Sequence, residues 1–252
     1  MKLTEESEKN IKFILQNYGN HLNIKSIKNS YLKKFYNEFI EANNYIKNIS
    51  KILKVNEIRN NNQTGSSSIF SSGIIPQNIK TYVKENCNYC ISVTLKINIL
   101  SDSRIFNIFF YICNNDYSLE LYKNYVDLIG IWLYFASKHS SISCSKSLNI
   151  FIYLNPHKKH LPNNNLEILD VEHVNSAFTT SCMLNGEILV FRTEEWFKVL
   201  IHETFHVFGL DFSSLNITPQ KELMKKTFEI NSNFNISESY CEFWARFLNI
   251  LF

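Results

Sequence analysis

Residues 193–209 read Thr-Glu-Glu-Trp-Phe-Lys-Val-Leu-Ile-His-Glu-Thr-Phe-His-Val-Phe-Gly, a stretch with no proline and with glycine only at its end. Thr193 is a suitable N-cap, and Gly209 is a suitable residue to end a helix. Glu194 and Glu195 would occupy the first turn, where acidic side chains interact favourably with the helix dipole. Apolar side chains surround the two histidines of the stretch. The pattern predicts a buried helix on which the rest of the fold is built.

Inside this helix, His202 and His206 are four residues apart, so both imidazoles leave the same face on successive turns. That spacing allows two neutral ring nitrogens to bind one Zn²⁺ at roughly 2.0–2.1 Å. Glu203 would lie beside the metal, where a carboxylate can take a proton from a metal-bound water. Two histidines packed in a core helix are the alternative interpretation. The motif predicts a zinc-dependent hydrolase.

A zinc site needs a third protein ligand, and the sequence offers two carboxylates for it. Asp211 lies five residues after His206, whereas Glu238 lies 32 residues after it. Glu238 belongs to a second helical pattern, residues 237–248, which has a wide apolar face. Glu238 and Glu242 share one face of that helix, and carboxylates on an otherwise apolar helix are costly unless they are paired or bind a metal. A solvated acidic edge is the alternative for this pair.

The combination of His202-Glu-x-x-His206 with Glu238-x-x-x-Glu242 resembles the gluzincin branch of the zinc metallopeptidases. The resemblance covers the C-terminal third of the chain. It implies that His202, His206 and Glu238 bind one Zn²⁺ per chain. It also implies that Glu203 is the general base and that Glu242 accepts a hydrogen bond from a ligating histidine ring, which fixes the tautomer of that ring.

Asp211 keeps a second possibility open. Gly209 also occurs in the metzincin branch, whose pattern is His-Glu-x-x-His-x-x-Gly-x-x-His/Asp. In this chain the last ligand position is occupied by Phe212, and Asp211 comes one residue early. Asp211 is therefore a minority candidate for the third ligand, and we expect it instead to cap or orient the turn after the helix.

The whole chain predicts an α+β fold in three parts. Residues 1–59 are a helical region with a break near Tyr18, and residues 60–80 are a linker-like segment rich in Asn, Ser and Gly. Residues 81–252 form the zincin-like metallopeptidase domain that the resemblance implies. In such a domain a twisted β-sheet packs on the active-site helix. A helix that carries the third metal ligand comes later, near the C-terminus. The helical region could be a removable pro-region, a partner-binding arm or, as we expect, a support for the core.

Several segments of this domain have strand patterns. Residues 91–99 alternate apolar and polar side chains, which is typical of a half-buried strand. The further strands are predicted at 105–113, 148–154, 171–182 and 188–192, and a helix is predicted at 117–138. Asn185-Gly186 would be the two-residue turn of a hairpin that leads into the last strand.

The resemblance also implies where a substrate binds. In zincins the edge strand nearest the active-site helix pairs with an extended substrate, so a protein or peptide is the implied partner. The residues placed to form this strand are Asn175, Ser176, Ala177 and Phe178. Zincins often add a side chain that stabilises the oxyanion. Spacing does not assign this side chain, and its candidates are His160, His173 and Tyr240.

Composition excludes several classes of protein. Apolar residues make up 45% of the chain and charged residues 19%, which is typical of a globular protein. The net charge of +3 is too small to indicate a nucleic-acid partner. Because no stretch of 18 apolar residues occurs, we expect no membrane span. The acidic, polar start of the chain argues against a signal peptide.

The six cysteines are expected to be free thiols in a reducing, cytoplasmic compartment, because the chain begins without a leader. Cys87-x-x-Cys90 is a lone pair and weak evidence for a metal. The zinc motifs, the abundance of Asn and the compact size together resemble peptidase-like proteins of large DNA viruses. That resemblance implies a virus factory or a virion as the location.

These patterns together predict a zinc metalloendopeptidase that hydrolyses peptide bonds with a zinc-bound water activated by Glu203. The alternative is a catalytically inactive protein that keeps the zincin fold as a structural or binding component, for instance of a virion. A decayed enzyme usually loses its base, and Glu203 is intact. The sequence therefore favours the enzyme.

Overall fold

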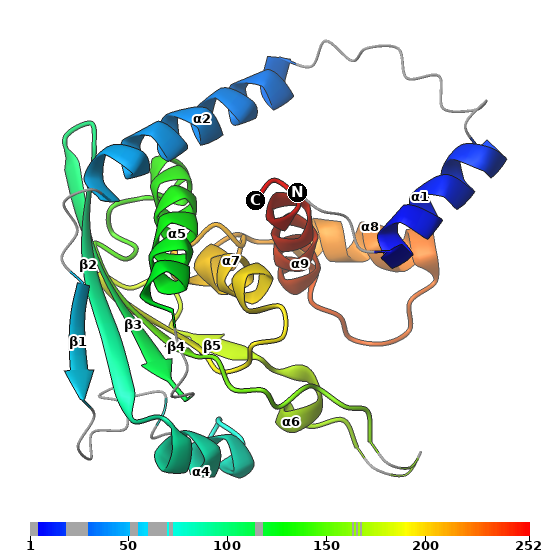
Figure 1. Cartoon of the computed structure of the whole chain (residues 1–252). Coiled ribbons are helices and arrows are strands. Elements are labelled where there is room, and N and C mark those ends of the chain that lie inside the picture. The colour runs from blue at the N-terminus through cyan, green and yellow to red at the C-terminus, as the bar shows by residue number, and fades with distance from the viewer. Residues whose placement is uncertain are drawn as a thin grey trace.

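The computed structural model describes residues 5–18, 30–50, 55–59, 70, 73–113, 118–162, 164, 166 and 168–252. These residues combine helices with one mixed sheet (Figure 1), which confirms the predicted α+β class. The helices are α1 (Glu5–Tyr18), α2 (Ser30–Ser50), α4 (Gln77–Asn86), α5 (Leu119–His139), α6 (Val171–Val174), α7 (Trp196–Val207), α8 (Thr218–Phe228) and α9 (Ile236–Asn249). The strands are β1 (Val55–Arg59), β2 (Tyr89–Ile99), β3 (Asp102–Ile112), β4 (Ser147–Tyr153), β5 (Ala177–Thr179) and β6 (Asn185–Val190).

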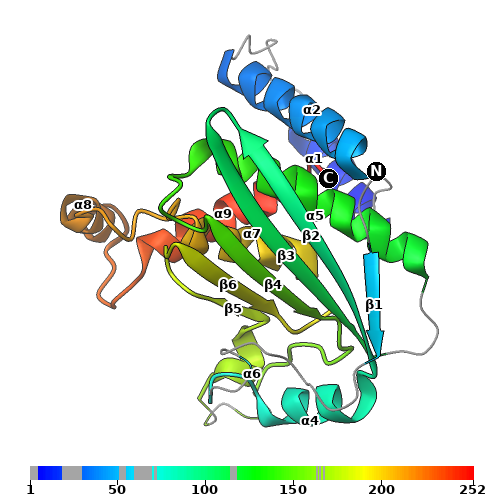
Figure 2. The same cartoon turned by 90° about the vertical axis from the view of Figure 1, so that its left-hand side faces the viewer.

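The strands of the sheet follow the order β1-β2-β3-β4-β6-β5 (Figure 2). The pairs β3–β4 and β4–β6 are parallel, and the other pairs are antiparallel. Parallel neighbours need a crossover, which α5 provides between β3 and β4. Strand β5 precedes β6 in the chain, pairs with it antiparallel and forms one edge of the sheet. This edge strand contacts α7, the helix that carries the two histidines.

The predicted alternation of β2 is confirmed. The buried side chains of the strand include Ile91, Val93, Leu95 and Ile97, and the exposed ones are Thr94, Lys96 and Asn98. The buried side chains belong to a core that also contains residues of α5 and α7. A second cluster includes Ile79 and Val83 of α4 together with Tyr153 and Phe191. The sheet is thus covered by α5 and α7 on one face and partly by α4 on the other.

Helix α2 packs on α5 and lies beside the core (Figure 1). The rings of Phe39 and Phe135 stack with their centroids 4.2 Å apart. Tyr134 Oη and Lys138 Nζ each donate to the carboxylate of Glu41 at 2.7 Å. These contacts are those expected of a supporting helix.

The boundaries of the N-terminal parts differ from the prediction. Residues 55–59, which we expected at the end of a helical region, form β1, because the open edge of β2 offers their backbone groups partners. Most of the linker-like segment 60–80 lies outside the described residues. Helix α4 crosses residue 80, where we expected that segment to end.

Two predictions between β4 and α7 were wrong. Residues 171–182 do not form one strand, because Asp170 caps the short helix α6 and only Ala177–Thr179 pair with β6. Asn185-Gly186 is not a hairpin turn, since both residues lie inside β6. A Cβ built on Gly186 would lie 2.6 Å from Ser145 Oγ and 2.6 Å from Val207 Cγ2. Glycine is needed there because α7 approaches the strand closely.

The cysteine prediction was wrong for four of the six residues. Cys87 pairs with Cys113 and Cys144 pairs with Cys182, whereas Cys90 and Cys241 are free and buried. The partners are 26 and 38 residues apart, so only the tertiary fold brings them together. These pairs give no support to a reducing compartment. Among the described helices, none has the length and apolar character needed to cross a membrane.

Candidate metal centre

Helix α7 begins later than the sequence predicts. Glu195 precedes it with a left-handed backbone (φ 56°), and Trp196 is the first helical residue. Thr193, the expected N-cap, instead donates from Oγ1 to the carbonyl of Asn155 at 2.9 Å. This bond ties the chain to the end of β4 before the helix starts. The predicted cap was therefore wrong, although the helix itself is confirmed.

Gly209 ends α7 as predicted. It has a left-handed backbone (φ 66°), a conformation that glycine adopts without strain. Its N–H donates to the carbonyl of His206 at 3.0 Å, and the N–H of Leu210 donates to the carbonyl of Phe205 at 2.8 Å. This bond pair is the Schellman motif. It satisfies the last carbonyls of the helix and turns the chain sharply after His206.

Helix α9 supplies the acidic side of the site. Asn235 caps it by accepting a hydrogen bond from the N–H of Ser237 at 3.0 Å. Cys241, Ala245 and Leu248 of α9 are buried, and the helix packs on α7. This packing directs Glu238 and Glu242 to the face of α7 that bears the histidines.

Three donor atoms converge between the two helices. His202 Nε2 lies 3.2 Å from His206 Nε2. Glu238 Oε2 lies 3.1 Å from His202 Nε2 and 3.5 Å from His206 Nε2. Within the described part of the chain, these three residues are the group with the spacing needed to hold a metal ion. Asp211, the other candidate for third ligand, lies on the far side of the His206 ring.

The histidines and Glu238 of this cluster shift each other's pKa values. Burial disfavours the protonated ring of His206, but hydrogen bonds to Glu238 and Asp211 outweigh it and raise its pKa to about 9. Hydrogen bonds with His202 and His206 hold the pKa of Glu238 far below its usual value. The cluster therefore holds a proton next to the Glu238 carboxylate, and a metal ion bound there would replace that proton.

Each histidine also has a carboxylate behind it. Asp211 Oδ2 lies 2.8 Å from His206 Nδ1, while its Oδ1 accepts from the N–H and hydroxyl of Ser213. Glu242 Oε2 lies 3.4 Å from His202 Nδ1, a longer contact. Asp211 thus orients the His206 ring through a short contact. The sequence indicated a role for Asp211 in the turn after the helix but did not indicate this contact.

Glu242 has stronger partners than the histidine. Lys198 Nζ donates to its two oxygens at 3.0 and 3.2 Å, and Arg246 Nε donates at 2.7 Å. Both cations lower the pKa of Glu242, against the opposing effect of burial. Lys198 was missed in the sequence because a single lysine on a helix carries no pattern.

Glu203 faces the same pocket as the donor atoms. Its carboxylate makes no hydrogen bond or ion pair within the described residues. Burial raises its pKa, and the nearby histidines only partly offset this effect. Glu203 is half-buried at the pocket wall, where water can reach its carboxylate, and a carboxyl with a raised pKa in such a cleft is a candidate for a chemical role.

The pocket that holds the cluster has a volume of about 580 Å³. Helix α7 forms one side, and Glu238 and Glu242 of α9 line it as well. The opposite side consists of residues 174–179, which include the edge strand β5 and the four residues predicted to bind a substrate. Lys159 and Lys198 add positive charge to its lining.

The pairing of β5 with β6 determines which backbone groups face the open edge. Hydrogen-bonded and non-hydrogen-bonded pairs alternate along antiparallel strands. The N–H of Phe191 donates to the carbonyl of Ser176 at 2.9 Å, so this pair is hydrogen-bonded. By alternation, the N–H and C=O groups of Ala177 and Thr179 point away from β6. They therefore face the free edge of the described sheet, where an added strand could pair with them, although Ala177 itself is buried and Thr179 is half-buried.

None of the three oxyanion candidates lines this pocket. Asp170 N–H donates to His173 Nδ1 at 2.9 Å, so this buried ring caps α6. His160 packs against His173 with ring centroids 5.4 Å apart. Tyr240 stacks on Phe212, with ring centroids 4.1 Å apart. All three side chains have structural contacts elsewhere.

Comparison of the chain with protein-family models, with curated proteins and with solved structures finds no match. A functional assignment consequently depends on the residues of the site and on their geometry.

Proposed function

We propose that this chain is a zinc metallopeptidase of the gluzincin type, with its active site in the pocket between α7, α9 and β5. The convergence of His202, His206 and Glu238 at one point carries the proposal. The unpaired carboxylate of Glu203 beside them supports a hydrolytic rather than a purely structural role. The mixed sheet, with an antiparallel edge strand next to the metal helix, supports a zincin-like fold.

The donor set fits Zn²⁺. A tetrahedral zinc ion with bonds of about 2.0–2.1 Å separates its donor atoms by about 3.3–3.4 Å. The three separations in the cluster are 3.1, 3.2 and 3.5 Å. Two imidazoles and one carboxylate form a ligand set known in catalytic zinc sites. Ca²⁺ and Mg²⁺ prefer oxygen ligands alone and would match this set poorly.

Zn²⁺ held by these residues would activate a water molecule and polarise the carbonyl group of a peptide bond. Glu203 would accept the proton of that water and pass it to the leaving amine. Its position one residue after His202 keeps the carboxylate next to the metal but outside the donor triangle. Asp211 and Glu242 would hold the imidazole rings in the tautomer that leaves Nε2 free for the metal.

An extended peptide is the substrate that the pocket supports best. The backbone groups of Ala177 and Thr179 at the open edge of β5 can pair with a peptide strand. Such pairing needs no particular side chain, so it suits a protein substrate of varied sequence. It would lay the peptide along the pocket, across the metal ligands on α7.

The decisive experiment measures zinc content and hydrolysis of a mixed peptide library together. Wild type is expected to contain one zinc per chain and to cleave peptides. Glu203→Gln should keep the fold and the zinc but lose hydrolysis by about 10²–10⁴-fold, because only the proton transfer is removed. His202→Ala and His206→Ala should lose the metal, since two ligands retain Zn²⁺ weakly.

Undiminished hydrolysis by Glu203→Gln would contradict the role of this residue as base. A wild-type chain that binds one zinc but cleaves no peptide would contradict the peptidase and favour a zinc-binding structural protein. A folded wild-type chain that binds no zinc would contradict the whole proposal.

A further inference from the structure

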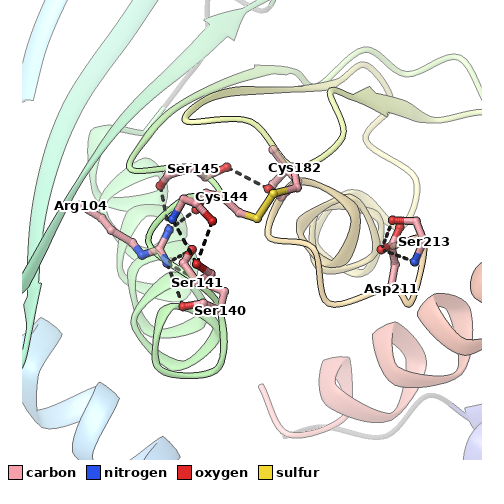
Figure 3. Close-up of a disulfide and its surroundings, with 10 residues drawn as sticks. Arg104, Ser140, Ser141, Cys144, Ser145, Cys182, Asp211 and Ser213 are labelled. Atoms are coloured by element: carbon pink, nitrogen blue, oxygen red, sulfur yellow. Dashed lines mark hydrogen bonds between the residues drawn. A yellow bond between two sulfur atoms is a disulfide. The ribbon is translucent and has the colours of Figure 1, made fainter. Parts of the chain in front are cut away.

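The end of α7 lies against the Cys144–Cys182 disulfide (Figure 3). Gly209 is the residue at the contact, because a Cβ built on it would lie 3.1 Å from Cys144 Sγ and 3.4 Å from Cys182 Cβ. His206 precedes this glycine by three residues, and Asp211 follows it by two. The disulfide therefore supports the stretch of backbone that places both residues.

Two more contacts hold the end of α7, one from the loop of residues 140–145 between α5 and β4 and one from β3. In the loop, Ser145 Oγ donates to the carbonyl of Val207 at 3.1 Å. In β3, the guanidinium of Arg104 lies over the ring of Phe208, 5.0 Å from its centroid. These contacts reach the last helical residue and the residue that caps the helix.

Arg104 makes this loop rigid (Figure 3). The buried guanidinium donates to the carbonyls of Ser140, Ser141, Cys144 and Ser145. Because these carbonyls come from nearly consecutive residues, one side chain fixes the course of the whole loop. Cys144 consequently belongs to a fixed platform, and the disulfide attaches a second segment to it.

That second segment belongs to the opposite wall of the pocket. Cys182 lies in the loop between β5 and β6, directly after Ser181, which lines the pocket. Cys182 is exposed, whereas Cys144 is buried. A small thiol reagent can therefore reach the disulfide from the Cys182 side.

We propose that the Cys144–Cys182 disulfide is a positioning element of the metal site, which joins the end of α7 to the loop after β5, and that a dithiol reductant weakens the site by opening it. This inference rests on the proposed metal site. In the reaction the S–S bond breaks, each cysteine sulfur gains one electron and one proton, and the dithiol loses two of each as it closes to a disulfide.

Opening the bond would leave the contacts of Ser145 and Arg104 with α7 in place. It would remove the covalent link beside Gly209 that supports the turn to Asp211, and the β5–β6 loop would then be joined to Ser145 by the hydrogen bond from the Ser145 N–H to the carbonyl of Met183. The effect should resemble the loss of an outer partner of a metal ligand, which costs about 10–100-fold in metal affinity.

The test compares two double variants that each remove one disulfide. Cys144→Ser/Cys182→Ser removes the proposed positioning element. Cys87→Ser/Cys113→Ser is the matched control, because it removes a bond that joins the end of α4 to the end of β3. The measurements are the Kd for Zn²⁺, the visible spectrum of bound Co²⁺ and hydrogen exchange of the Gly209 and Leu210 amides.

We expect the first variant to bind Zn²⁺ about 10–100-fold more weakly, to change the Co²⁺ spectrum and to exchange these two amides faster. The control should match the wild type in zinc affinity, Co²⁺ spectrum and amide exchange. After treatment with a dithiol, the control should exchange the two amides as fast as the first variant does. If the first variant does not fold, dithiol treatment of the folded control tests the same bond, because the Cys144–Cys182 disulfide is then the one left to open.

Unchanged affinity, spectrum and exchange in the first variant would overturn the inference. Equal losses in both double variants would also overturn it, since they would reflect general stability alone. The exchange measurement needs no metal. A wild-type chain without zinc affinity would therefore contradict the proposed function, while the support of α7 by the disulfide would still be tested.

Discussion

The carboxylate of Asp211 lies 2.8 Å from Nδ1 of His206, on the side of the ring away from Glu238. A carboxylate at this nitrogen accepts a hydrogen bond from Nδ1–H, and in the neutral ring this fixes the tautomer whose Nε2 lone pair can bind a metal. The hydroxyl and N–H of Ser213 hold the other oxygen of Asp211 in place. Asp211 is thus a partner of a proposed metal ligand, although its place in the sequence also allowed a ligand or a cap of the turn after the helix.

This relationship predicts the order in which three acidic residues matter for zinc affinity. Glu238→Ala should release most of the metal, because it removes one of the three donor atoms. Asp211→Ala should weaken affinity by about 10–100-fold. Glu242→Ala should cost less than Asp211→Ala, because its contact with His202 is 3.4 Å long and Lys198 and Arg246 compete for its oxygens. Zinc dissociation constants of the folded variants measure this order.

Asp211→Asn is the matched control for the charge, since the amide keeps the shape of the side chain. If Asp211→Ala removes the metal and Glu238→Ala retains it, Asp211 is a ligand and the gluzincin assignment is wrong. If Glu242→Ala lowers zinc affinity more than Asp211→Ala does, the short contact between Asp211 and His206 does not determine zinc affinity.

Gly209→Ala should destabilise the protein. The left-handed backbone at this position costs an alanine about 1–2 kcal/mol, and the new Cβ would lie 3.1 Å from Cys144 Sγ. Gly73→Ala is a suitable control, because a Cβ there meets no atom within 4 Å. Urea unfolding of the two variants measures the difference. Equal stability of both would show that the turn after α7 tolerates a side chain.

Glu41→Gln should reduce stability more at neutral pH than in acid. Hydrogen bonds from Lys138 and Tyr134 lower the pKa of the Glu41 carboxyl below its usual value of about 4.5. A carboxyl whose pKa is lowered by folding stabilises the folded state above its usual pKa, and this contribution is lost as the pH falls through the folded pKa. The side chain is 51% exposed, so the effect should stay below about 1 kcal/mol.

Urea unfolding of wild type and Glu41→Gln at pH 7 and at pH 3 measures this contribution. The difference in free energy of unfolding should be larger at pH 7 than at pH 3. A difference of the same size at both values would mean that packing of α2 on α5, and not the charge of Glu41, is what the substitution changes.

Local patterns in the sequence predicted the elements that depend on local physics. The alternation at residues 91–99 predicted β2, because one face of that strand is buried and the other is open. The spacing of His202 and His206 predicted two converging rings, since a helix brings residues four apart onto one face. Glu238 could be proposed because a carboxylate pair on an apolar helix is costly without a partner.

Predictions that depend on contacts between distant residues were the ones that were wrong. Asn185-Gly186 has the composition of a turn, but Gly186 lies in a strand because Val207 and Ser145 approach it. Thr193 has the composition of a helix cap, but its hydroxyl bonds to Asn155, which is 38 residues away. The disulfides likewise join residues whose proximity no local pattern records.

The last prediction concerns the edge strand. Thr179→Ala is the matched control for the hydrogen bond from Thr179 Oγ1 to the carbonyl of Glu187 in β6, which a proline also removes. Beyond that bond, Thr179→Pro should leave the backbone pairing of β5 with β6 intact, because the N–H that proline lacks points away from β6 at this position. It should raise KM for peptide substrates, since that N–H is one of those proposed to pair with the substrate. Phe178→Pro instead removes an N–H that faces β6, as the alternation from Ser176 indicates, and should lower the free energy of unfolding by about 1–3 kcal/mol, because its acceptor in β6 is left without a partner. Peptide hydrolysis and urea unfolding of both variants separate the two effects. A Thr179→Pro enzyme with unchanged KM would show that substrates do not bind along β5, whatever the outcome for the metal.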